Sequence, residues 1–251
     1  MAAAAIIHKR HSGIRLLCLC ALLATTGAHA VRFERIESDG QGYVVAHVDP
    51  AKEHIQMFPA PMNGNTFAEV ERQVGSQKKK LVFATNGGMY QPDYSAVGLL
   101  VVGGKELTRL NTAKNNPDFN FTTKPNGVFA VTRHGARVVE SSRYAQIAKD
   151  TLEATQSGPA LVLDGALHPG LKPGSTSRHV RNGVGVTESG EAIFVISEQG
   201  VTLHEFATLF RDRLDCPNAL YFDGSVSSLH APQLNRSDSF RLLGPIVGVV
   251  E

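Results

Sequence analysis

The sequence predicts an α+β fold: a single domain built on a mixed, largely antiparallel β-sheet with a few packed helices. Short runs rich in Val, Ile, Leu and Phe recur along the chain, bounded by Gly, Pro, Asn or Asp, which is typical of strands. Helical periodicity is confined to a few segments, and the strands come in blocks rather than in regular strand–helix alternation. No Pro- or Ser-rich break divides the chain, so we expect one domain over residues 31–251.

The expected strands share a mostly apolar composition and end at turn-forming residues. In chain order they cover residues 31–37, 43–48, 54–58, 80–85, 96–102, 127–131, 160–163, 183–186, 192–196, 219–222 and 245–250. Because they far outnumber the helical segments, sheet is expected to form most of the core.

Three segments are expected to be helical. The first, residues 66–77, carries apolar side chains at spacings of three and four, which places them on one helical face. The second, residues 202–214, opens with Thr202 and Glu205 at the spacing of a capping box. Residues 142–149 form the third.

The first thirty residues have the pattern of a cleaved signal peptide. A basic segment precedes a short apolar run, and Ala28-His29-Ala30 offers small residues at the two positions that a signal peptidase reads. The apolar run is about half of the ~20 residues that a membrane-spanning helix needs. We therefore expect cleavage after Ala30, no transmembrane anchor in the mature chain, and a periplasmic or secreted protein.

Removal of this leader changes the charge and the cysteine count. The full chain has 25 Lys+Arg, 23 Asp+Glu and three Cys. Several of the basic residues and two cysteines lie in the leader, so the remainder is close to neutral and keeps only Cys216. It can form no internal disulfide, and its core must hold it together. Without a long basic run, no nucleic-acid partner is expected.

Several catalytic signatures are missing from the sequence. It has no Gly-x-Ser-x-Gly elbow of a serine hydrolase. The histidines beyond the leader form no His-x-His or His-x-x-x-His pair, and no Asp/Asn-rich calcium loop is present. We therefore expect neither a metal nor another cofactor.

Four clusters of glycines and polar residues lie at the ends of expected strands. They are Asn86-Gly87-Gly88, Gln156-Ser157-Gly158-Pro159, Arg178-His179-Val180-Arg181-Asn182 and Asp223-Gly224-Ser225. Glycine lets a backbone turn sharply or approach a ligand closely, and Arg is well shaped for bidentate contact with a phosphate or carboxylate. Each cluster alone also fits an ordinary turn or surface loop. Their combination predicts a ligand site, because function often lies on loops held by a rigid scaffold.

Taken together, the motifs resemble the phosphodiester glycosidase family, and most closely its bacterial exported branch. The likeness spans roughly residues 81–251 and rests on Asn86-Gly87-Gly88-Met89-Tyr90, Gln156-Ser157-Gly158-Pro159, Arg181-Asn182-Gly183-Val184-Gly185 and Asp223-Gly224-Ser225-Val226-Ser227, in this order. The family's usual Asn-Gly-Gly-Phe-Phe ends here in Met89-Tyr90. Its Asp-Gly-Gly-Gly-Ser has Ser225-Val226 in place of two glycines.

The resemblance implies an exported hydrolase that cleaves a sugar-1-phosphodiester, an N-acetylglucosamine-1-phosphate type of linkage, in phosphorylated envelope or extracellular glycans. Because a phosphate monoester leaves as a stable anion, the site must neutralise phosphate more than supply a strong general acid. The candidate catalytic residues are Arg181, which would bind phosphate, Asp223, which would act at the anomeric centre, and Asn86. The candidate substrate-binding residues are Gly87, Gly88, Ser157, Gly158, Arg178, His179, Asn182, Gly224 and Ser225. Asp164 and Glu198 are reserve carboxylates.

Three other functions stay open on the sequence. The domain could bind a glycan or phospholigand in the periplasm without turnover, which tight binding with no product would reveal. It could be a structural or interaction protein, for which no ligand would raise the stability. It could also be an ordinary glycosidase with two carboxylates, which would cleave sugar–sugar bonds lacking phosphate.

Overall fold

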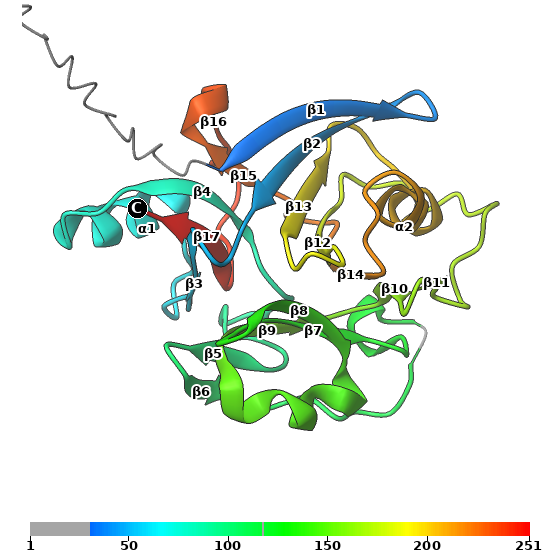
Figure 1. Ribbon diagram of the computed structural model, residues 1–251, viewed down its shortest axis with the longest axis horizontal. Coiled ribbons are helices and arrows are strands. Elements are labelled where there is room, and N and C mark those ends of the chain that lie inside the picture. Colours follow the sequence, from blue (N-terminus) through cyan, green and yellow to red (C-terminus); the bar gives the residue numbers. More distant parts are fainter. Residues whose placement is uncertain (1–30, 117) are drawn as a thin grey trace, which may run out of the picture.

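The computed structural model describes residues 31–116 and 118–251, over which the strands form three sheets (Figure 1). The predicted signal peptide, residues 1–30, lies outside the described residues. The predicted α+β fold is confirmed, and the ladders between neighbouring strands are all antiparallel. The strands are distributed over three sheets, which pack around a common centre.

The largest sheet has seven strands, and its middle is buried on both faces. Its order is β1 (Arg32–Ser38), β2 (Gln41–Val48), β13 (Ala192–Ser197), β12 (Asn182–Val186), β14 (Asn218–Asp223), β10 (Ala160–Leu163) and β11 (Ala166–Leu167). Every residue of β12 and β13 is buried, which explains their nearly continuous apolar sequence. In the ladder between β12 and β14, Asn182 lies opposite Asp223, so two of the polar clusters meet at one end of this sheet.

Two five-stranded sheets complete the framework. The second sheet has the order β16 (Arg236–Ser237), β15 (Leu229–Ala231), β4 (Leu81–Asn86), β17 (Ile246–Val250) and β3 (His54–Phe58). The third has the order β6 (Lys105–Thr108), β5 (Leu100–Val102), β9 (Thr151–Ser157), β7 (Gly127–Thr132) and β8 (Gly135–Glu140). Figure 1 shows the third sheet below the other two.

Phenylalanine rings join the three sheets at a shared core. The ring of Phe194, on β13, lies 5.0 Å from that of Phe83 on β4 and 5.5 Å from that of Phe129 on β7. Aromatic pairs at these separations add to the hydrophobic stabilisation of burial. Because successive strand residues point to opposite faces, Val44 enters this core, while Tyr43 and Val45 are buried on the opposite face of the sheet.

A helical segment covers the outer face of each sheet. Helix α2 (Leu203–Asp212) packs on the seven-stranded sheet, and α1 (Phe67–Ser76) on the second sheet. The 3₁₀ helix η2 (Ser141–Gln146) packs on the third through Tyr144. Shorter 3₁₀ turns are η1 (Asn120–Thr122), η3 (Ala148–Asp150) and η4 (Pro232–Leu234). Within the described chain, no helix is both long and apolar enough to span a membrane.

Two predicted segments differ clearly from the structure. Residues 142–149 form 3₁₀ turns rather than an α-helix. Tyr144 and Ile147, the two residues of this segment that pack on the core, are three positions apart, which is the repeat of a 3₁₀ helix. The strand predicted over residues 96–102 is shortened to Leu100–Val102. The side chain of Gln156 occupies the space before it, and its Oε1 accepts a hydrogen bond from the backbone N–H of Leu99 at 3.1 Å.

Candidate functional site

A buried hydrogen-bond network joins three of the four polar clusters. The side chain of Asn182 accepts from Nδ2 of Asn86 at 3.2 Å and donates to the Asn86 carbonyl at 3.0 Å. The Ser227 hydroxyl also lies 3.2 Å from Oδ1 of Asn182 and 3.0 Å from the carbonyl of Asp223. These bonds tie the end of β4, the start of β12 and the turn after β14 into one rigid unit.

The fourth cluster, Gln156-Ser157-Gly158-Pro159, contacts the strand that leads into the turn at Asp223. Ser157, at the end of β9, is fully buried, and its hydroxyl donates to the carbonyl of Phe222 at 2.9 Å. Phe222 directly precedes Asp223, so β9 holds the strand that carries this carboxylate. The structure therefore brings all four sequence clusters together around the turn that begins at Asp223.

Arg181 is an almost completely buried cation beside this network, with 2% of its surface exposed. Its Nε donates to the carbonyl of Val201 at 2.8 Å, Nη1 to the hydroxyl of Tyr221 at 3.0 Å, and Nη2 to the carbonyl of Ser177 at 3.0 Å. Since a guanidinium has five N–H groups, two of them have no protein acceptor in this set.

The charge of Arg181 is not neutralised by a contacting carboxylate. Over residues 31–116 and 118–251, no Asp or Glu oxygen lies within 4.0 Å of it. Burial lowers the pKa of Arg181, while Tyr221 and Asp223 oppose this effect. The group still remains protonated, because an arginine does not lose its proton in proteins. The site therefore holds a desolvated positive charge, which favours an anion.

A small cavity of about 100 Å³ lies against this guanidinium. Its lining residues are Asn120, Ser175, Ser177, His179, Arg181, Leu203, Tyr221, Gly224 and Ser225. A Cβ atom at Gly224 would overlap the Tyr221 hydroxyl and lie 3.2 Å from Nη1 of Arg181. The glycine thus keeps open the space above the cation.

Asp223 shapes the turn that separates this cavity from a larger one. Its Oδ1 accepts hydrogen bonds from the backbone N–H groups of Ser225 and, at 2.8 Å, of Val226. The residue is half-buried, and its negative charge acts on both Arg181 and Tyr90. Asp223 itself is absent from the lining of the two cavities, whereas Gly224 and Ser225 line both.

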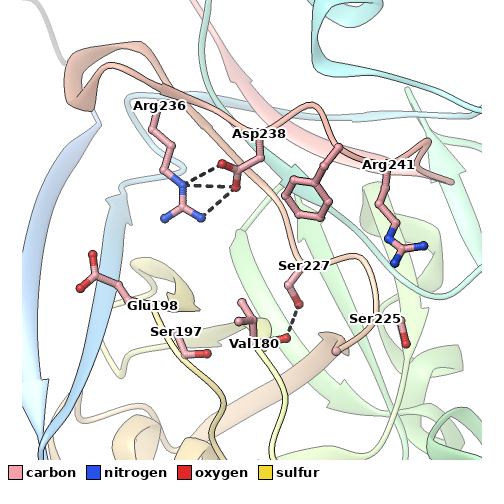
Figure 2. A pocket seen from close by; sticks show the side chains of 10 residues that line it. Val180, Ser197, Glu198, Ser225, Ser227, Arg236, Asp238 and Arg241 are labelled. Carbon is pink, nitrogen blue, oxygen red and sulfur yellow. Dashed lines mark hydrogen bonds and ion pairs between the residues drawn. The ribbon is translucent and has the colours of Figure 1, made fainter.

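The larger cavity measures about 590 Å³ and has both polar and apolar side chains in its wall (Figure 2). It is lined by Val180, Ser197, Glu198, Gly224, Ser225, Ser227, Arg236, Asp238, Phe240 and Arg241. Of the carboxylates that the sequence held in reserve, Glu198 lies here. Asp164 instead pairs with Arg143 at 2.8 Å, in a turn that lines neither cavity.

The segment 236–241 supplies four lining residues of the larger cavity and was not among the residues predicted for the site. It reads Arg-Ser-Asp-Ser-Phe-Arg, and its two arginines, aspartate and aromatic ring within six positions were an available signal. The segment contains no glycine and does not follow an expected strand, so it lacks the pattern by which the four clusters were identified.

Several predicted substrate-binding groups are occupied by protein contacts. The Gly87 N–H donates to the carbonyl of Pro245 at 2.7 Å and the Gly88 N–H to the Thr155 hydroxyl at 3.1 Å. At Gly158 an added Cβ would lie 2.7 Å from the Phe121 carbonyl, so this glycine is required by packing. These glycines permit close approach of protein backbone rather than of a ligand.

The side chains of the other predicted residues divide in the same way. The Asn86 amide is engaged at both its nitrogen and its oxygen, since Nδ2 donates to Asn182 and Oδ1 accepts from the Ser228 N–H at 2.9 Å. Arg178 points to α2, where its Nη1 lies 2.9 Å from Oε1 of Glu205. His179, by contrast, is exposed and lines the small cavity beside Arg181. Among the described residues, no group of three or more His, Cys, Asp or Glu is placed to hold a metal ion.

Comparisons with known proteins identify the family of the chain. The model of the phosphodiester glycosidase family matches residues 79–250. The protein YigE of Escherichia coli (strain K12) is 30% identical over 185 residues, which cover 73% of this chain and 72% of YigE.

Two solved structures share the fold. The catalytic domain of zebrafish N-acetylglucosamine-1-phosphodiester α-N-acetylglucosaminidase, auto-inhibited by its pro-peptide, superposes with a TM-score of 0.61 at 14% identity, covering 87% of this chain and 81% of that one. A Burkholderia pseudomallei protein named as an exported protein has a TM-score of 0.54 at 11% identity, with coverage of 83% and 74%. The family match extends over more than half of the sequence and includes all four clusters, and on this basis the chain belongs to the phosphodiester glycosidase family, a family of hydrolases of phosphodiester sugar linkages.

Proposed function

We propose that the protein is an exported hydrolase that cleaves a sugar-1-phosphodiester of the N-acetylglucosamine-1-phosphate type in envelope or extracellular glycans. The observation that carries the proposal is Arg181, a buried guanidinium without a contacting carboxylate at the wall of a small cavity. A buried charge is costly unless a partner compensates it, so this cavity favours an anionic ligand group. The signal-peptide pattern of residues 1–30 supports export.

The sizes of the two cavities suggest how such a substrate would lie. The small cavity, about 100 Å³, is well below the roughly 300–1,000 Å³ of typical small-molecule pockets and suits a single phosphate group. The larger one, about 590 Å³, lies within that range. Because Gly224 and Ser225 line both, the bond to be broken would lie beside this turn.

In the proposed reaction, water attacks the anomeric carbon, and the bond between that carbon and the phosphate oxygen breaks. The electron pair of this bond leaves with the phosphate, and Arg181 stabilises the negative charge there. Asp223 acts either as the base that takes the proton from water or as the carboxylate that stabilises positive charge at the anomeric carbon. Asn86 and Asn182 are positioning residues, since their amides hold the turn that carries Asp223.

The test is sugar release from the methyl phosphodiester of N-acetylglucosamine 1-phosphate. We expect Asp223→Asn and Arg181→Ala each to lower kcat/KM by about 100-fold or more, the scale of a lost acid–base or charge-stabilising group. Asp164→Asn is the matched control, because that carboxylate lies outside the site. Thermal unfolding of each variant separates lost chemistry from lost folding.

Undiminished turnover by folded Asp223→Asn and Arg181→Ala proteins would overturn the residue assignment. Tight binding of the diester with no sugar released after long incubation would instead favour a non-catalytic binding domain that uses the same cavities.

A further inference from the structure

We infer that the larger cavity is the sugar subsite and that Arg236, Asp238 and Phe240 determine which sugar it accepts, the ligand being an uncharged hexopyranose. This inference rests on the proposed function for the position of the phosphate. Its own basis is the chemistry of the cavity wall, to which the segment 236–241, outside the four sequence clusters, contributes four residues.

Arg236 and Asp238 form a rigid pair on this wall. Nε of Arg236 lies 3.1 and 3.2 Å from the two Asp238 oxygens, and Nη2 lies 2.8 Å from Oδ2. The same Oδ2 accepts from the backbone N–H of Leu229 at 2.9 Å, and the Asp238 N–H donates to the Leu229 carbonyl at 3.0 Å. The side chains are only 27% and 17% exposed, so the pair is held in place rather than free in solvent.

The pair leaves hydrogen-bonding groups free on the cavity side. Three of the five N–H groups of Arg236 have no acceptor among the described residues, including both on Nη1. Figure 2 shows the guanidinium nitrogen without a dashed line directed to the side where Glu198 lies. The Arg236 guanidinium can donate hydrogen bonds and the Asp238 carboxylate can accept them. Together they match neighbouring sugar hydroxyls, each of which both donates and accepts.

An apolar surface accompanies this polar edge. Phe240, 66% exposed, and Val180, 37% exposed, also line the cavity. Large exposed apolar side chains in a cleft are characteristic of binding sites. A pyranose has C–H groups on its ring faces and hydroxyls around its edge, so a ring lying on Phe240 would turn its edge to the Arg–Asp pair.

The charges of the cavity favour a neutral ring. Arg236 is compensated by Asp238, and Glu198 is compensated by Arg35, whose Nε lies 3.4 Å from Oε1. Figure 2 shows Arg241 and Ser225 on the side of the cavity opposite to Arg236 and Glu198. Ser225 also lines the small Arg181 cavity. The phosphate side of the substrate would thus meet positive charge, and the sugar side would meet ion pairs that are already neutral.

The experiment measures kcat and KM for methyl phosphodiesters of six α-hexose 1-phosphates: N-acetylglucosamine, N-acetylgalactosamine, N-acetylmannosamine, glucose, galactose and mannose. For the best of these we expect Arg236→Gln and Phe240→Leu each to raise KM about tenfold or more, with kcat changed less than threefold and with reduced discrimination among the sugars. Phe240→Trp, which keeps an aromatic face, is expected to raise KM less than Phe240→Leu does. Inorganic phosphate, which probes the Arg181 cavity, should inhibit all variants equally.

Two controls separate recognition from folding. Arg143→Gln breaks another Arg–Asp pair outside the cavities, and Leu107→Ala removes an exposed apolar side chain on β6. Neither is expected to change KM. A purely structural role for the Arg236–Asp238 pair would lower thermal stability and leave KM and sugar discrimination unchanged, which would overturn the inference.

The inference and the proposed function can fail separately. If wild-type protein hydrolyses a diester and Arg236→Gln keeps its KM, the function stands and the sugar subsite is wrong. If no diester is hydrolysed, calorimetry with the six free sugars decides. Binding that Arg236→Gln weakens about tenfold supports the subsite without the reaction, whereas no binding of any sugar overturns it.

Discussion

Tyr221 holds Arg181 by its hydroxyl and by its ring. Nη1 of Arg181 lies 3.0 Å from the hydroxyl, and the guanidinium carbon lies 5.3 Å from the ring centre. Both residues are almost fully buried, and burial raises the pKa of Tyr221, so its hydroxyl stays neutral at physiological pH. The tyrosine therefore orients the guanidinium without cancelling its charge, which prepares it for an anion before the ligand arrives.

Tyr221→Phe tests this arrangement directly. Because it removes a hydrogen bond to a charged group, we expect the free energy of unfolding to fall by about 1.5–3 kcal/mol. The affinity for inorganic phosphate should also fall several-fold, since Nη1 loses its anchor. Urea unfolding and calorimetry measure the two effects. Tyr43→Phe is the control, because Tyr43 is equally buried, stacks on Phe206 and lines neither cavity. Unchanged phosphate affinity in Tyr221→Phe would show that the tyrosine does not orient Arg181.

Gly224→Ala tests whether the small cavity is the anion site. The added methyl group would overlap the Tyr221 hydroxyl and crowd Nη1 of Arg181, so we expect phosphate affinity to fall at least about tenfold and stability to fall by about 1–3 kcal/mol. Gly174→Ala, where nothing lies within 4 Å of the added atom, should change neither. Adding Tyr221→Phe to Gly224→Ala removes the overlapping hydroxyl, so the two stability losses should be less than additive. Strict additivity would contradict the predicted overlap.

The strands whose bounds the sequence predicted best are short segments rich in apolar residues and glycine. β3 and β10 have the predicted bounds, and β12 and β13 extend the prediction by one residue each. β9 was missed, because its sequence, Thr-Leu-Glu-Ala-Thr-Gln-Ser, buries polar side chains whose partners are distant in the chain. Pairing partners of this kind cannot be inferred from local composition.

For the site, the sequence revealed which segments meet and not which atoms face a ligand. Glycines marked the strand ends, yet the N–H groups of Gly87 and Gly88 donate to other parts of the protein. The Asn86 amide likewise forms its hydrogen bonds within the buried network. Arg181 is the opposite case, since the arginine that abuts a buried strand in the sequence does line a cavity, and its catalytic role stays a prediction. Whether a polar group is satisfied depends on contacts between strands far apart in sequence, and these exist only in the folded chain.

The capping box of α2 offers a test of how the fold supports the site. Thr202 Oγ1 accepts from the Glu205 N–H at 3.1 Å, and Oε2 of Glu205 accepts from the Thr202 N–H at 2.8 Å. Thr202→Ala should lower the free energy of unfolding by about 0.5–2 kcal/mol. Because Val201, the preceding residue, holds Nε of Arg181, phosphate affinity should fall as well.

Thr66→Ala is the matched control for that change. Thr66 also caps its helix, α1, by accepting from the Glu69 N–H at 3.2 Å, but it lines neither cavity. Both variants are expected to lose similar stability by urea unfolding, and only Thr202→Ala to lose phosphate affinity. Equal phosphate affinities for the two variants would separate α2 from the site.

Glu153 provides a pH-dependent test of the packing between sheets. It is buried on β9, and its two carboxylate oxygens accept from the backbone N–H groups of Met57 and Gly103, each at 2.8 Å. Burial raises the pKa of Glu153 above its ordinary value of 4.5, while these two hydrogen bonds oppose the rise. The folded state therefore binds a proton more tightly than the unfolded state does.

The sign of the pH dependence follows from that difference. Between the ordinary pKa and the raised one, the folded chain holds more protons at Glu153, so its contribution to stability is greatest below pH 4.5 and falls as the pH rises through the raised value. Glu153→Gln should lower the free energy of unfolding by about 1–3 kcal/mol, because its amide NH₂ must face one of two backbone donors. Since the glutamine does not titrate, the advantage of the wild type over the variant should shrink as the pH is raised from 4 to 7. Urea unfolding of both proteins across this range measures the difference, and an advantage that grows with pH would mean that the hydrogen bonds from Met57 and Gly103 outweigh burial.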